Sequence, residues 1–166
     1  MCSVQSCSPE KSVSLIVQEN FPFDPLPLAD LFTDREDLFL VYPKAKFPFD
    51  PEEWKMFMNS HSLNRSYLFS NVNQPLKMIG HGALLKRERQ DTLWVSFIYV
   101  VPEQRNKGIG KMIVSELEAL VRKAEGIQRL ALTVRDYNPT TLHCYLKLGY
   151  QEFQREGTAI KMEKTV

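Results

Sequence analysis

The sequence from Tyr99 to Val121, YVVPEQRNKGIGKMIVSELEALV, joins three different patterns. Apolar and β-branched residues end at Pro102, a basic stretch with two glycines follows, and apolar residues then recur every three or four positions from Ile109 onward. These patterns predict a strand, a loop and an amphipathic helix. A helix start preceded by glycine presents free backbone N–H groups and the positive end of the helix dipole. The stretch is therefore typical of a phosphate-binding loop.

Two common phosphate-binding fingerprints do not fit this loop. A dinucleotide-binding loop needs G-x-G-x-x-G, but Ile113 stands where the third glycine should be. A Walker A loop needs G-x-x-x-x-G-K-[ST], but Arg105 occupies the position of the first glycine and Met112 follows Lys111. The loop therefore belongs to a different class of phosphate site.

The rest of the chain predicts a mixed fold in which antiparallel strands precede a β–α–β–α segment and a closing hairpin. Asp50 and Asn138 are expected to be helix N-caps, each followed by proline, and Gly126 and Gly149 are expected to stop helices. Strands are expected over residues 12–18, 66–72, 76–88, 91–101, 129–134, 150–156 and 158–166, and helices over 28–41, from 51, over 109–124 and over 139–148.

Composition narrows the classes of protein. The 166 residues suit one domain, 1–166, with residues 1–12 expected as a flexible tail. A net charge of +1 argues against nucleic-acid binding, and no apolar run is long enough to span a membrane. The start of the chain has no signal-peptide core, so we expect a cytoplasmic protein. The spacing of the three cysteines and three histidines predicts no metal site.

Acidic residues concentrate in the first third of the chain. Eight acids and three bases lie between Asp24 and Glu53, so this stretch carries −5 and the remainder +6. Such a division suits a cationic substrate held beside an anionic cofactor, and a solvated acidic surface would give the same count.

The loop motif R-x-x-G-x-G, Arg105–Gly110, resembles the pyrophosphate loop of the GNAT superfamily of acyl-CoA-dependent N-acetyltransferases. A second stretch, NPTTLHCYLKLGY from Asn138 to Tyr150, resembles the later family pattern N-x-x-A-x-x-x-Y-x-x-x-G-[FY], with Thr141 in place of alanine. The resemblance is good from Ser66 to Val166. It implies an α/β fold with a central, mostly antiparallel sheet of six to seven strands, about four helices and a splayed strand pair at the cofactor site.

The resemblance also implies residues that bind acetyl-CoA as co-substrate. The backbone of the strand before the loop would pair with the pantetheine amides, the loop amides would hold the pyrophosphate, and basic side chains would add positive charge. The implied cofactor-binding residues are Ile98, Tyr99, Val100, Arg105, Asn106, Lys107, Gly108, Ile109, Gly110, Lys111 and Asn138.

Tyr145 is the implied catalytic residue, as the donor of a proton to the departing CoA thiolate, although a core aromatic would show the same pattern. Family members often carry a glutamate on the strand before the loop, but TLWVSFIYVV has no carboxylate. Ser96 through a water, His81 or an acid of the Asp24–Glu53 stretch are alternatives, so no base is assigned. Cys144 is expected in the core.

Two functions from different classes follow. The favoured one is transfer of acetyl from acetyl-CoA to a primary amine by direct attack in a ternary complex. The other is a non-catalytic acetyl-CoA-binding sensor. Acids and aromatics of the early loops (Phe47, Phe49, Trp54, Phe57) suit a small cation such as a polyamine or amino sugar, a peptide amine, or simply a core. A homodimer is left open.

Overall fold

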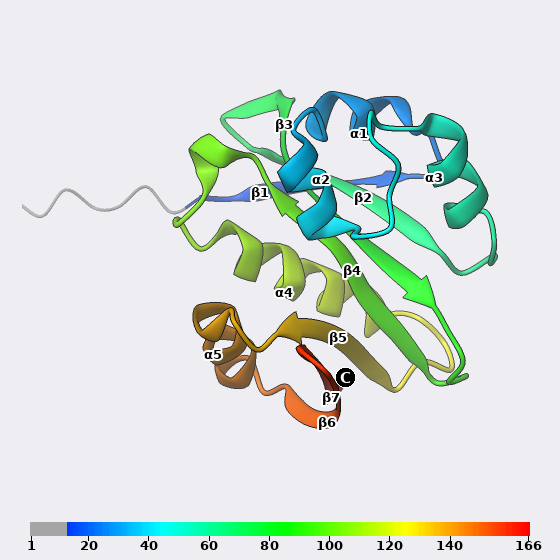
Figure 1. Ribbon diagram of the computed structural model, residues 1–166, viewed down its shortest axis with the longest axis vertical. Coiled ribbons are helices and arrows are strands. Elements are labelled where there is room, and N and C mark those ends of the chain that lie inside the picture. The colour runs from blue at the N-terminus through cyan, green and yellow to red at the C-terminus, as the bar shows by residue number, and fades with distance from the viewer. Residues whose placement is uncertain (1–12) are drawn as a thin grey trace, which may run out of the picture.

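A seven-stranded sheet runs through the computed structural model, which describes residues 13–166 (Figure 1). The strand order is β1-β2-β3-β4-β5-β7-β6. The expected mixed α/β fold is confirmed; the expected tail, residues 1–12, lies outside the described residues. In chain order the elements are β1 (Leu15–Asn20), α1 (Leu26–Leu31), α2 (Arg35–Val41), α3 (Pro51–Met58), β2 (Arg65–Asn71), β3 (Gln74–Lys86), β4 (Thr92–Val100), a 3₁₀ turn (Pro102–Gln104), α4 (Ile109–Val121), β5 (Arg129–Arg135), α5 (Pro139–Lys147), β6 (Gln151–Glu156) and β7 (Ala159–Thr165).

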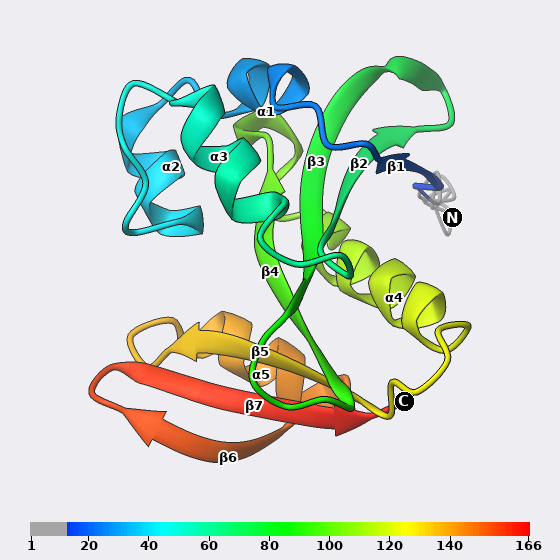
Figure 2. The ribbon, with the colours of Figure 1, turned by 90° about the vertical axis from the view of Figure 1, so that its right-hand side faces the viewer.

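The sheet is antiparallel except where β4 meets β5. These two strands run parallel, and they pair only over Thr92–Trp94 with Arg129–Ala131. Beyond Trp94 the two strands separate, and β5 pairs along its full length with β7 on its other edge (Figure 2). The expected splayed strand pair is therefore present, and the second half of β4 has one open edge.

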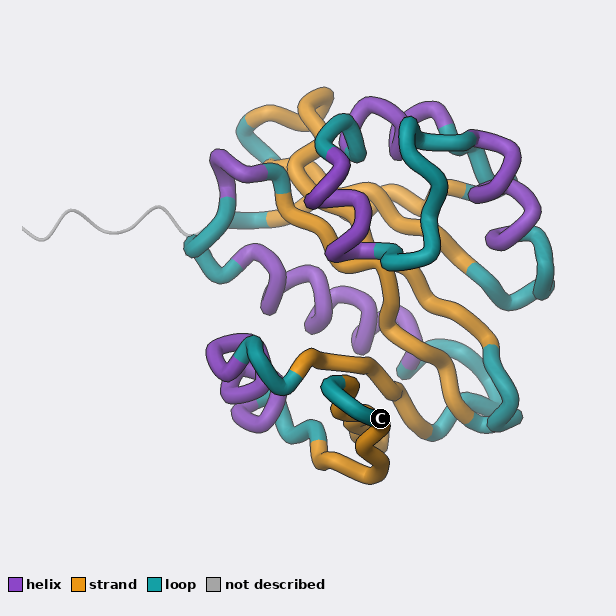
Figure 3. Tube along the Cα trace, in the orientation of Figure 1, coloured by secondary structure: helices purple, strands orange, loops and turns teal. Residues whose placement is uncertain are grey.

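Helices cover both faces of the sheet. Figures 2 and 3 show α4 against one face of the β1–β4 half and the helices α1, α2 and α3 against the other. Two glycines of β3 make room for α4, because a Cβ at Gly80 would lie 2.8 Å from Ile113 Cδ1 and 2.9 Å from the Tyr99 carbonyl oxygen. A Cβ at Gly82 would lie 3.0 Å from side-chain atoms of Ile113 and Leu117. Small residues in β3 thus let α4, the helix that follows the glycine loop, pack closely on β3.

Helix boundaries follow local capping. The Asp50 carboxylate accepts hydrogen bonds from the backbone of the following turn, and Asn138 does the same for α5, as expected. The single helix expected over 28–41 is wrong, because the chain forms two short helices there. Asp34 has extended backbone angles, so the helix cannot continue through it. Its side chain accepts a hydrogen bond from the Asp37 N–H at 2.9 Å and caps the start of α2.

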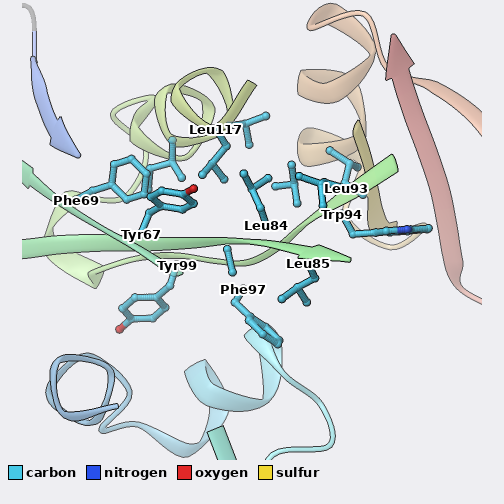
Figure 4. Close-up of a cluster of buried hydrophobic side chains, with 14 of the residues drawn as sticks. Tyr67, Phe69, Leu84, Leu85, Leu93, Trp94, Phe97, Tyr99 and Leu117 are labelled. Atoms are coloured by element: carbon cyan, nitrogen blue, oxygen red, sulfur yellow. The ribbon is translucent and has the colours of Figure 1, made fainter. Parts of the chain in front are cut away.

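The core has two aromatic-rich layers. Tyr67, Phe69 and Leu117 lie on the α4 side of the sheet, and Phe97 and Tyr99 point to the opposite side (Figure 4). On that side Trp54 is fully buried and stacks on neighbouring aromatic rings. Of the four early aromatics, Trp54, Phe49 and Phe57 pack in this cluster, while Phe47 is 43% exposed. The core alternative is therefore correct for three of them.

Candidate active site

A β-bulge lies in β4 where the strand leaves β5. Its residue Phe97 has a φ of 54°, and the β3–β4 register shifts between His81 and Ala83. The Phe97 carbonyl oxygen accepts a hydrogen bond from His81 Nδ1–H at 2.8 Å, and Ser66 Oγ lies 2.7 Å from His81 Nε2. Since a carbonyl can only accept, the proton is on Nδ1 and the Ser66 hydroxyl donates to Nε2. The bulge is thus fixed by a side chain from the neighbouring strand.

His81 has a structural role. It is fully buried, and burial lowers the pKa of its imidazole to about 4. Both ring nitrogens have protein partners, so neither is available to take a proton from a substrate. His81 was one of the bases that the sequence left open, and the structure instead makes it a buried histidine with both nitrogens satisfied.

The loop before α4 presents a row of unused backbone donors. Gly108 has a φ of 77° and Asn106 a φ of 61°, and no side chain caps the helix start. Within the described chain, no backbone carbonyl accepts from the N–H groups of residues 106–108, and the next three N–H groups have no intrahelical partner. The first helical bond runs from Met112 N–H to the Gly108 carbonyl. This row of N–H groups at a positive helix end suits an anion.

Gly110 is the second residue of α4, and a Cβ there would meet only Val100 Cγ2, at 4.0 Å. The folded chain itself therefore has room for a side chain at this position. A glycine that the surrounding protein does not require is what close approach of a ligand to the backbone would need. The open space at Gly110 therefore suits a diphosphate bound directly to the loop backbone.

Arg105 connects the loop to β4 and α2. Its Nε donates to the Val100 carbonyl oxygen at 2.9 Å, and its Nη2 lies 3.0 Å from Asp37 Oδ2. The Tyr99 hydroxyl donates to the same carboxylate at 3.2 Å, and burial together with that carboxylate raises the pKa of Tyr99 to about 12. Through these two contacts Arg105 stabilises the junction between the end of β4 and the loop. The basic side chains of Lys107 and Lys111 are exposed at the loop.

The open edge of β4 includes part of the expected pantetheine strand. The Val101 N–H donates to the Ile79 carbonyl of β3 at 2.9 Å. In an antiparallel pair this turns the backbone groups of Tyr99 toward β3 and those of Val100 toward the gap. The Val100 carbonyl oxygen already accepts from Arg105. The bulge at Phe97 interrupts this regular alternation just before Ile98.

Tyr145 and Asn138 lie on α5, which packs against β5. Asn138 Oδ1 accepts from the Thr141 N–H at 3.4 Å, so its expected capping role is confirmed, and its contact with a cofactor stays a prediction. The Tyr145 ring packs edge to face on Tyr150, with centroids 5.9 Å apart. Burial raises the pKa of Tyr145 to about 12, and its hydroxyl has no partner among the described side chains. Tyr145 is therefore a neutral phenol with a hydroxyl able to bind a ligand atom.

A cavity of about 750 Å³ lies between α1, α2, β3 and the end of β4. Four acids of the acidic stretch line it, and Lys77 is the one basic residue in its lining. The cavity was predictable from sequence only in part: the excess of acid in the first third was visible, but the contributions of Glu103 and of the Tyr99 side chain depend on the fold. The acidic lining residues are Asp24, Asp30, Asp34, Asp37 and Glu103.

Other groups carry less chemistry. Cys144 is a partly buried free thiol on α5. Within residues 13–166, no three His, Cys, Asp or Glu side chains are placed to hold a metal ion together. In the same range, every helix is too short or too polar to cross a bilayer.

Comparison with known proteins agrees with this geometry. The model of the acetyltransferase (GNAT) family matches residues 28–150. Since this match spans most of the chain, the chain belongs to the GNAT acetyltransferase family and is an acyltransferase.

Solved structures of similar fold include three acetyltransferases. The spermidine N-acetyltransferase from Vibrio cholerae in complex with CoA and spermine is 17% identical, with a TM-score of 0.70 over 91% of this chain and 95% of that chain. A GNAT family acetyltransferase from Elizabethkingia anophelis with acetyl-CoA bound is 16% identical, with a TM-score of 0.66 over 92% and 98%. A GNAT family acetyltransferase from Streptococcus pneumoniae is 20% identical, with a TM-score of 0.64 over 92% and 100%. At these identities the likeness is one of fold.

Proposed function

We propose that this enzyme transfers an acetyl group from acetyl-CoA to a primary amine of a small polycation, by direct attack in a ternary complex. The observation that carries the proposal is the loop at the start of α4, where Gly110 leaves open space above a row of unbonded N–H groups. Such a loop binds the diphosphate of a CoA thioester through its backbone. The open edge of β4 beside it would receive the pantetheine arm as an added strand.

The reaction needs an amine nitrogen to bond to the acetyl carbon while the carbon–sulfur bond breaks. The departing sulfur takes up a proton, and Tyr145 supports that step because its pKa of about 12 keeps the phenol protonated at every pH where the fold is expected to work. The amine releases its proton to solvent, and solvent then restores the proton of Tyr145.

The acidic cavity supports a small polyamine as acceptor. Its lining combines carboxylates with apolar side chains such as Leu31, Met78 and Val101, and an alkyl polyamine combines ammonium groups with methylene segments. The Vibrio cholerae enzyme of similar fold is a spermidine N-acetyltransferase with spermine bound, which favours the same class of acceptor here. Asp37 and Glu103 pair with Arg105 and Lys77, which leaves Asp24, Asp30 and Asp34 without an ion pair in the described chain, and a peptide amine would bring fewer charges to them than a polyamine.

The test is CoA-thiol release from acetyl-CoA across amines: spermidine, spermine, an aminoglycoside, amino acids, and peptides with a free α-amine or lysine. We expect release with the polyamines. Asp30 has no side-chain hydrogen bond in the described chain, so Asp30→Asn removes one cavity charge and should raise the polyamine KM several-fold with the acetyl-CoA KM unchanged.

Two other outcomes would change the assignment. Release with peptides alone would move the acceptor from a small polyamine to a protein. Binding of acetyl-CoA without release on any amine would favour the non-catalytic acetyl-CoA sensor, for which the lack of a carboxylate on β4 is the supporting observation.

A further inference from the structure

A buried hydrogen bond joins Tyr150 to Glu118 between two segments that are distant in sequence. The Tyr150 hydroxyl donates to Glu118 Oε1 at 3.0 Å, and the two residues are 1% and 4% exposed. The second carboxylate oxygen, Oε2, accepts from Lys164 Nζ of β7 at 3.0 Å and lies 3.5 Å from Arg122 Nη2. One carboxylate of α4 thus holds the residue that follows α5 and a lysine of β7.

Tyr150 in turn holds Tyr145 in two ways. The Tyr150 N–H donates to the Tyr145 carbonyl oxygen at 3.1 Å, and the two rings meet at an interplanar angle of 61°. Gly149, with a φ of 94°, makes the tight turn that brings Tyr150 back beneath α5. The Tyr145 ring therefore rests on a ring whose own hydroxyl is fixed.

The position of Glu118 gives this arrangement a use beyond stability. A buried carboxylate is a weak source of stability, because its desolvation offsets most of what its partners return. Glu118 also lies on α4, the helix whose first turn carries the proposed diphosphate loop, nine residues or about 14 Å further along the axis. A bond from this helix to Tyr150 fixes Tyr145 relative to the helix that anchors the cofactor.

We propose that Glu118 and Tyr150 are positioning residues that hold the Tyr145 hydroxyl at the thioester sulfur. The inference rests on the proposed function, since it assumes that Tyr145 donates the proton taken up by sulfur when the carbon–sulfur bond breaks. Neither Glu118 nor Tyr150 exchanges a proton in this step. Their effect passes through the place of the Tyr145 ring.

The experiment is a double-mutant cycle on kcat with Tyr145→Phe, Tyr150→Phe and the double variant, at saturating acetyl-CoA and polyamine. Tyr150→Phe keeps the ring and removes only the hydroxyl. We expect about a hundredfold loss of kcat for Tyr145→Phe, as for loss of a general acid, and about a tenfold loss for Tyr150→Phe with the acetyl-CoA KM within about twofold of wild type. The double variant should lose no more than Tyr145→Phe alone.

Tyr67→Phe is the matched control, because Tyr67 is 7% exposed, lies on β2 and has no hydrogen bond from its hydroxyl to another described residue. Its kcat should equal that of wild type. Hydrogen exchange of the peptide covering residues 139–150 should rise in Tyr150→Phe and stay unchanged in Tyr67→Phe, which tests the contact independently of turnover.

The outcomes separate the positioning role from the proposed function. A tenfold loss that Tyr150→Phe repeats on the Tyr145→Phe background would make Tyr150 a general structural residue and overturn the inference. An unchanged kcat in Tyr150→Phe, or unchanged exchange of residues 139–150, would also overturn it while leaving acetyl transfer intact. Wild-type enzyme that binds CoA but transfers to no amine would refute the proposed function itself, and the positioning role with it.

Discussion

Replacement of Gly110 by alanine should make the protein more stable and a poorer binder of CoA. Gly110 lies in the first turn of α4, and the nearest atom to an added Cβ is Val100 Cγ2 at 4.0 Å, so the folded chain has nothing to rearrange. Alanine is favoured over glycine in a helix by about 0.5–1 kcal/mol, in part because glycine leaves the unfolded chain more freedom. In a domain of this size that gain corresponds to a rise in Tm of about 1–4 °C.

The same methyl group should hold a diphosphate away from the backbone. A hydrogen bond to a charged group contributes about 1.5–3 kcal/mol, and about 1.4 kcal/mol is a factor of ten in affinity. Loss of one such bond should therefore weaken CoA binding about tenfold to a hundredfold. Calorimetric unfolding of the ligand-free protein and a calorimetric titration with CoA measure the two effects separately.

Ser115→Ala is the matched control on the exposed side of the same helix. It should also raise helix stability by a few tenths of a kcal/mol, and it should leave CoA affinity unchanged. If Gly110→Ala bound CoA as tightly as wild type, close approach of the ligand at this residue would be refuted. If it lowered Tm, the open space above Gly110 would be refuted instead.

Three further predictions concern packing and pH. Gly80→Ala should lower the free energy of unfolding by about 1–3 kcal/mol, measured by urea titration, because its Cβ would lie 2.9 Å from a backbone oxygen; stability equal to wild type would contradict the close packing of α4 on β3. His81 has a folded-state pKa of about 4 against about 6.5 unfolded, so the unfolded state binds the proton more readily and about 3 kcal/mol of stability should be lost as pH falls from about 7 to about 4. His81→Gln should lack this part of the pH dependence in urea titrations, and an identical slope in both proteins would show that His81 titrates normally. The acceptor amine, with a pKa of about 10, must lose a proton before it attacks, and the cavity lining offers carboxylates and Tyr99, whose pKa is raised to about 12. The polyamine kcat/KM should therefore rise about tenfold per pH unit between about pH 6.5 and 8.5, and a plateau below about pH 8 would reveal a base.

Local signals account for most of what the sequence predicted correctly. The helix from Ile109, the N-caps Asp50 and Asn138, and the stop at Gly149 depend on neighbouring residues, so they could be recognised before any tertiary structure was known. The break at Asp34 also had a local signal, a capping residue followed by acids, but the apolar spacing across it suggested one helix.

Groups from distant segments were harder to place. The sequence does not show that Arg105 reaches Asp37, or that Tyr99 and Glu103 complete an acidic cavity, because these contacts arise only when α2 packs on β4. Glu118 looks like one more polar residue of an amphipathic helix. Its burial depends on Tyr150 and Lys164, which lie 32 and 46 residues further along the chain.

The short contact between β4 and β5 also leaves the sheet interrupted beyond Trp94. Three residue pairs at one end of the two strands are the only backbone ladder between the two halves of the described sheet, and side-chain contacts such as those of Glu118 with Tyr150 and Lys164 join the halves elsewhere. A pantetheine arm lying in the gap would form hydrogen bonds with the free edge of β4, beyond the three paired residues. Binding of the co-substrate would then turn an interrupted sheet into a continuous one, and part of its binding free energy would appear as stiffness between the half that carries the acidic cavity and the half that carries Tyr145.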